Sequence, residues 1–69
     1  MAGVTLFVVS VLGQDIFWNG AGDLTPDISS AASYEKFSEA ELALMDCQGA
    51  HARAYGPSGF EIRTMLSFR

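Results

Sequence analysis

The side chains best able to do chemistry in this chain are a single histidine, His51, and a single cysteine, Cys47. Histidine can act as a general base and cysteine as a nucleophile, but each needs a partner held at a suitable distance. His51 stands between two alanines, with no acid or nucleophile at a spacing typical of a catalytic triad. Cys47 falls on the apolar stripe of an expected helix, where a small core residue is the simpler interpretation. We therefore expect no catalytic residue and no enzymatic activity.

Residue types that bind metals and phosphates are present but are not clustered. One histidine and one cysteine do not make a zinc site, and the acids are spread along the chain. Gly20 and Gly22 are not followed by the Lys-Ser or Lys-Thr pair of a phosphate-binding loop. Ser29, Ser30 and Ser33 stand where the caps of helical turns need hydroxyl groups. The sequence therefore predicts no metal site and no cofactor.

The stretch 4–12 is the most strongly patterned part of the chain. Its β-branched and aromatic residues favour a strand, and apolar side chains occupy both of its faces. It has about half of the ~20 residues that a membrane-spanning helix needs. No Lys or Arg precedes it, as a secretion signal would require. We expect a folded strand and no contact with a membrane, and the lone cysteine is compatible with a cytoplasmic protein.

Composition and periodicity predict the remaining elements. They are a strand over 16–18, a helical turn capped by Asp27, a helix from Ser33 to Gly49, and strands over 50–55 and 60–68. This order, β-β-α-β-β, predicts a single α+β domain over residues 1–69. Its simplest form is an antiparallel sheet of about four strands with one helix packed on one face. Because Phe17 and Trp18 are adjacent on a strand, they point to opposite faces, and we expect one of them either to be exposed or to cover the free side of the sheet.

Helical spacing divides the expected helix into two faces. The core stripe consists of Phe37, Ala40, Ala43, Leu44 and Cys47. The outward face carries the candidate partner-binding residues Glu35, Glu39, Leu42, Met45 and Asp46. Leu42 and Met45 would form an apolar spot with an acidic rim. The alternative is an ordinary solvated face, because single exposed apolar residues are common on protein surfaces.

The negative charge is concentrated in the first two thirds of the chain. The net charge is −4, and residues 1–49 hold seven acids against a single lysine. Residues 50–69 hold three arginines against one acid. Direct binding of nucleic acid is disfavoured, since the phosphate backbone attracts dense positive charge. A protein partner with a basic surface fits the charge better.

One helix can cover one face of a four-stranded sheet, so the other face needs a cover from elsewhere. We expect Phe7, Val9, Val11 and Phe17 to form an exposed apolar patch on that face. A patch of this kind commonly marks an interface. These residues therefore make a candidate homodimer interface, and the alternative function is a small self-assembling structural or adaptor module without inhibitory activity.

The middle of the chain resembles very small phage and mobile-element proteins. The resemblance is carried by Trp18, the segment Asp27-Ile28-Ser29-Ser30-Ala31, Tyr34 and the segment Glu39-Ala40-Glu41-Leu42-Ala43-Leu44. Chains of this size, acidity and architecture are similar to anti-CRISPR proteins, which inhibit a bacterial defence complex by occupying its nucleic-acid-binding or partner-binding surfaces. The resemblance implies a non-enzymatic inhibitor in the cytoplasm of an infected or host bacterium, with acids that imitate phosphates. Leu42 departs from the pattern, which usually carries a polar residue there.

Overall fold

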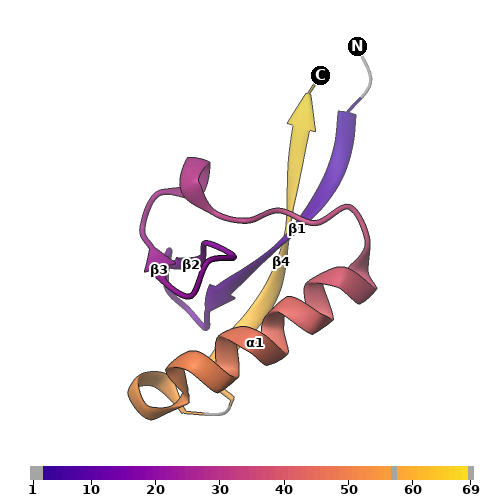
Figure 1. Ribbon diagram of the computed structural model, residues 1–69. Helices are drawn as coiled ribbons and strands as arrows, with labels where there is room; N and C mark the ends of the chain where they lie inside the picture. Colours follow the sequence, from indigo (N-terminus) through magenta and orange to yellow (C-terminus); the bar gives the residue numbers. More distant parts are fainter. Residues whose placement is uncertain (1–2, 57, 69) are drawn as a thin grey trace.

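The computed structural model describes residues 3–56 and 58–68, which form one antiparallel sheet and one helix. The elements are β1 (Gly3–Val11), β2 (Phe17–Trp18), β3 (Leu24–Thr25), the 3-10 turn η1 (Ile28–Ser30), α1 (Phe37–Tyr55) and β4 (Phe60–Phe68). The strands lie in the order β3-β2-β1-β4 and α1 crosses one face of the β1–β4 pair (Figure 1). The predicted α+β class, with a four-stranded antiparallel sheet and one helix packed on it, is confirmed.

The long ribbon formed by β1 and β4 is the frame of the molecule. Its register runs without a bulge from the pair Gly3–Phe68 to the pair Val11–Phe60. The end of the ribbon that carries both chain termini projects beyond the helix, which gives the molecule extents of 42 × 23 × 21 Å (Figure 1). The alternation of residues 60–68 predicted β4 with its observed bounds.

Local hydrogen bonds form the η1 turn as the sequence indicates. The Asp27 carboxylate accepts from the backbone N–H of Ser29 at 3.0 Å and from its hydroxyl at 2.7 Å. These bonds favour the charged form and lower the pKa of Asp27. The serines in this segment therefore stabilise a turn, as expected. Ala31, at the end of the turn, and Lys36, the N-cap of α1, both have extended backbone conformations.

Helix α1 is longer than predicted and extends through the residues expected to form a strand. It continues past Gly49 to Tyr55 and ends at Gly56, whose φ is 80° and whose N–H donates to the Ala52 carbonyl at 2.7 Å. The predicted strand over 50–55 is therefore wrong. Alanine is the best helix former, and a helix tolerates one interior glycine at a cost of about 1 kcal/mol. The fourth strand of the sheet is the short β3, which precedes the helix.

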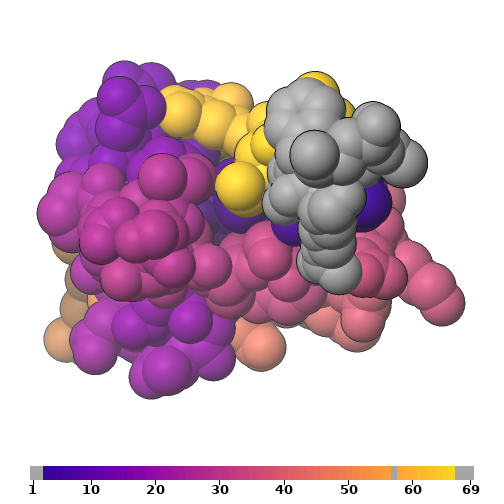
Figure 2. Space-filling model, turned by 90° about the horizontal axis from the view of Figure 1, so that it is seen from above, coloured from indigo at the N-terminus to yellow at the C-terminus, as the bar shows by residue number. Residues whose placement is uncertain are grey.

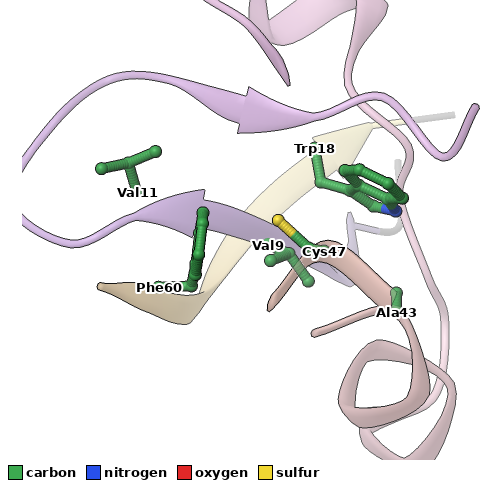
Figure 3. Packing of buried hydrophobic residues seen from close by; sticks show 6 residues of the cluster. All are labelled: Val9, Val11, Trp18, Ala43, Cys47 and Phe60. Carbon is green, nitrogen blue, oxygen red and sulfur yellow. The ribbon is translucent and has the colours of Figure 1, made fainter. Parts of the chain in front are cut away.

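Small residues on α1 let the helix lie close to the sheet. Ala40, Ala43 and Cys47 are its buried residues, and all three belong to the predicted core stripe. Figure 3 shows Cys47 and Ala43 beside Val9 of β1, with further contributions to the core from Val11, Trp18 and Phe60. This cluster is the centre of the hydrophobic core.

The apolar patch predicted as a homodimer interface lies inside the molecule. Val9, Val11 and Phe17 are 0%, 2% and 7% exposed, and Phe7 is half-buried against the ring of Phe37. Val9 and Val11 face α1, because the helix covers the face of β1 that was expected to be free. Trp18 and Phe17 are both buried, so neither is exposed. Phe17 pairs with Ser10 and so lies on the face of the sheet turned away from α1, which is the second of the two predicted alternatives.

The face of β1 turned away from α1 is covered too. Leu6, Val8 and Ser10 are buried there, and the Ser10 hydroxyl has no hydrogen-bond partner in the described part of the chain. Their cross-strand neighbours on β4 are Met65, Arg63 and Glu61. Met65 is apolar throughout, whereas Arg63 and Glu61 can cover apolar surface with their stems while their charged ends stay at the surface.

An ion-pair network holds these β4 side chains over the turn that follows β1. Arg63 contacts the Asp15 carboxylate at 3.1 Å and donates to the Gln14 carbonyl at 3.0 Å. Glu61 accepts from the Gly13 N–H at 3.2 Å and lies 3.4 Å from the Arg63 guanidinium. Seen from above, atoms of the turn (violet) and of β4 (yellow) lie together on the side opposite α1 (Figure 2). The turn and this network therefore form the second cover of the sheet.

Candidate protein-interaction surface

Cys47 is a core residue, as the sequence predicts. Its side chain is fully buried between α1 and the sheet, and burial raises the pKa of the thiol to about 11. The thiol is therefore protonated at neutral pH, and the thiolate is the form that acts as a nucleophile.

His51 lies on α1, not on a strand as expected, and its contacts are structural. Its Nε2 atom lies 3.1 Å from the Gly22 carbonyl oxygen, and its ring meets the Trp18 ring edge-on with 5.8 Å between centroids. It thus ties the second half of the helix to the loop between β2 and β3. Across residues 3–56 and 58–68 there is no pocket and no group of three His, Cys, Asp or Glu side chains that could hold a metal ion.

The outward face of α1 carries two large exposed apolar side chains. Leu42 is 65% exposed and Met45 is 66% exposed. They are three residues apart, so they are neighbours on the helix surface, opposite the buried Ala40 and Cys47. We call Leu42 and Met45, together with the acids that border them, the α1 outer face.

Acidic side chains border this apolar pair on both sides. Glu39 and Asp46 stand three and four residues from Leu42, and Glu41 stands four residues from Met45, so helix geometry places each beside its apolar neighbour. All three acids are exposed, and the ion pairs found in the described residues involve none of them. Glu41 was missed as a site residue, although the same spacing argument that selected Glu39 and Asp46 could have found it.

Glu35 and Phe37 depart from their predicted positions because α1 starts later than expected. Glu35 is exposed but precedes the helix, so the helical spacing does not place it with Leu42 and Met45. Phe37, predicted in the core, is 52% exposed and touches the ring of Phe7, with 5.6 Å between centroids. The Phe7–Phe37 pair, at the first turn of α1, is thus a second apolar group at the surface, separate from Leu42 and Met45.

Tyr34 lies beside the acidic edge of the α1 outer face. It pairs with Phe7 through two backbone hydrogen bonds of 2.8 Å, which place its segment alongside β1. Partial burial and, after it, the negative charges of Asp46 and Glu39 raise the pKa of the Tyr34 phenol. The charges of Glu39 and Asp46, on one border of the α1 outer face, therefore act on Tyr34.

Comparison with known proteins finds no matching family model, no matching curated protein and no matching solved structure. Within the described residues, no helix combines the length and the apolar composition needed to cross a membrane. The α1 outer face offers apolar area and exposed negative charge on a regular helix, which suits contact with another protein.

Proposed function

We propose that this chain is a non-enzymatic protein-binding inhibitor that docks its α1 outer face onto a basic surface of a partner protein. The observation that supports this most is the exposure of Leu42 and Met45 side by side, within a border of exposed acids. Large apolar side chains of this kind supply the central contacts of interfaces, and charges around them select the partner.

The energetics of docking fit such a surface. Full burial of one leucine or methionine side chain is worth about 1.5–3 kcal/mol, so the two together can supply a substantial share of a micromolar affinity. The acids add long-range attraction to a basic partner and raise the association rate more than the affinity. Both apolar residues stand on a regular helix that packs on the sheet through Ala40, Ala43 and Cys47. Little conformational entropy of the backbone is therefore lost on binding.

The resemblance to anti-CRISPR proteins supports a bacterial defence complex as the partner. Such a complex holds nucleic acid in a basic channel, where exposed carboxylates can take the place of phosphates. Leu42 and Met45 would add apolar contacts that a nucleic acid backbone does not make. These contacts would let the inhibitor remain bound at salt concentrations that screen the charges.

The test is binding of the purified chain to purified defence complexes, measured by surface plasmon resonance. We expect Leu42→Ala and Met45→Ala each to weaken binding about tenfold, which corresponds to about 1.4 kcal/mol. Glu39→Lys combined with Asp46→Lys should slow association and reduce its salt dependence.

Two matched controls keep the test specific. Leu12→Ala removes a comparably exposed leucine, 57% exposed in the turn after β1, and Asp23→Lys reverses an exposed charge in the loop between β2 and β3. Neither should change binding. Partner binding that is unaffected by Leu42→Ala and by the double lysine variant would overturn the proposal.

A further inference from the structure

One edge of the sheet is formed by β4, whose backbone has a row of hydrogen-bonding groups directed away from β1. The sheet order places β4 at the edge, beside β1 only. The Leu12 N–H donates to the Gly59 carbonyl at 2.8 Å, so these two residues form a hydrogen-bonded pair. In an antiparallel ladder every second residue bonds to the partner strand, and the residues between them direct their N–H and C=O groups to the other side. Arg63 and Met65 therefore bond to β1, while the N–H and C=O groups of Ile62, Thr64 and Leu66 point away from it. The described part of the chain offers these three residues no backbone partner.

This edge lacks the features that usually keep an edge strand from pairing. Natural edges are protected by proline, lysine, bulges or short length. Residues 60–68 contain no proline and no lysine, and their register with β1 is unbroken over nine residues. The charges of Glu61 and Arg63 are held over the turn at Gly13, Gln14 and Asp15, on the far side of β1 from the edge.

We propose that a second copy of this chain pairs with β4 along this edge, antiparallel about a two-fold axis at Thr64, and joins the two four-stranded sheets into one. Such an interface is self-complementary by symmetry, because each outward backbone group meets its counterpart in the other copy. Each pair of outward-facing residues exchanges two backbone hydrogen bonds.

The side chains select this register over its neighbours. With the axis at Thr64, Ile62 stands opposite Leu66 of the second copy, and the two threonines stand opposite each other. Leu66 is 59% exposed in the single chain and gains an apolar cross-strand neighbour. With the axis at Arg63, two like charges would stand directly opposite, which is destabilising. With the axis at Ile62, the paired segment is shorter and Leu66 stays exposed.

The pairing also fixes where the two helices lie. A two-fold axis perpendicular to the sheet keeps both copies of α1 on the same face. If the proposed function holds, the dimer then presents two α1 outer faces toward the same side and can bind a repeated or extended basic surface with higher avidity. The dimer itself does not depend on that function.

Light scattering of the full chain from micromolar to millimolar concentration tests the proposal. We expect the mass to rise toward twice 7.4 kDa. Leu66→Lys should raise the dimer dissociation constant at least tenfold, because it places lysine on the edge beside the axis. Leu42→Lys is the matched control, since it makes the same change at a similarly exposed leucine on α1 and should leave the dimer intact.

Amide exchange locates the contact directly. In the dimer, the amides of Ile62, Thr64 and Leu66 should exchange at least tenfold more slowly than in Leu66→Lys, whereas Arg63 and Met65 should be protected in both. Thr64→Pro should also prevent pairing between the two copies, because proline has no N–H to donate at the axis. The single chain should still fold, since the Thr64 N–H does not bond to β1 and proline is tolerated on edge strands.

Three outcomes would overturn the edge pairing. They are a monomer at millimolar concentration, a dimer that Leu42→Lys dissociates and Leu66→Lys does not, and unprotected outward amides in a dimer. Loss of partner binding in Leu42→Ala with the dimer intact would separate this inference from the proposed function.

Discussion

Among single residues, Cys47 shows how burial decides reactivity. Its side chain is fully buried beneath α1, and burial raises the pKa of its thiol to about 11. Because the thiolate is the reactive form, we expect a disulfide reagent such as dithionitrobenzoate to label the native protein near neutral pH only as fast as the protein unfolds. In urea, labelling should be immediate. A native protein labelled as fast as free cysteine would contradict this burial.

The same thiol should make the protein less stable in alkaline solution. Its pKa is raised from 9.0 to about 11, so the unfolded chain loses the proton first as the pH rises. The contribution of the thiol to stability is complete below pH 9.0 and is lost as the pH rises through about 11. About 2 kcal/mol of unfolding free energy should disappear over this range. Urea unfolding at several pH values measures it, and Cys47→Ala, titrated in parallel, should show a shallower decline.

Among the elements, the two long strands could be predicted from the sequence better than the short β3, which was not predicted, or the second half of the helix. Residues 60–68 alternate clearly, and β4 has those bounds. Residues 50–55 also alternate, but alanines at every second position suit a helix as well as a strand. The deciding contacts join His51 to Trp18 and to Gly22, which is 29 residues away in sequence. Local pattern does not contain that information.

Gly49 is the position where this ambiguity can be tested. It lies in the middle of α1, and a Cβ added there would have nothing within 4 Å. Gly49→Ala should therefore raise the free energy of unfolding by about 0.5–1 kcal/mol, because alanine restricts the unfolded chain and favours helix. Gly59→Ala is the contrasting variant, since its Cβ would overlap the Tyr55 carbonyl and should destabilise the protein. Urea unfolding compares them, and a loss of stability in Gly49→Ala would contradict a continuous helix.

Across the whole molecule, the sequence predicts that both faces of β1 need cover, but not which cover each face receives. Val9 and Val11 meet α1, while Val8 and Ser10 lie under the Glu61 and Arg63 network. That network depends on contacts between residues 48 and 49 positions apart, so strand periodicity does not reveal it. The exposure of Leu42 and Met45 follows from helical spacing alone, which is why the centre of the candidate site was predictable.

The uneven cover of the β1–β4 ribbon should produce a gradient of stability along it. At the Val11–Phe60 end both residues are buried, whereas at the other end Thr5, Thr64 and Leu66 are exposed. Exposed hydrogen bonds with few apolar contacts around them open at lower free energy than those in the core. We expect the Ser10 amide to exchange with an opening free energy close to that of global unfolding. The opening free energy at the Leu6 amide should be about 1 kcal/mol lower.

Native-state hydrogen exchange measures this gradient. The Leu66→Lys variant is the right sample, because edge pairing between copies would otherwise add protection at the projecting end. Equal exchange free energies at Ser10 and Leu6 would mean that the ribbon opens as one unit. In that case the projecting end would be held as firmly as the part beneath α1, and cover by the helix would not be what sets its stability.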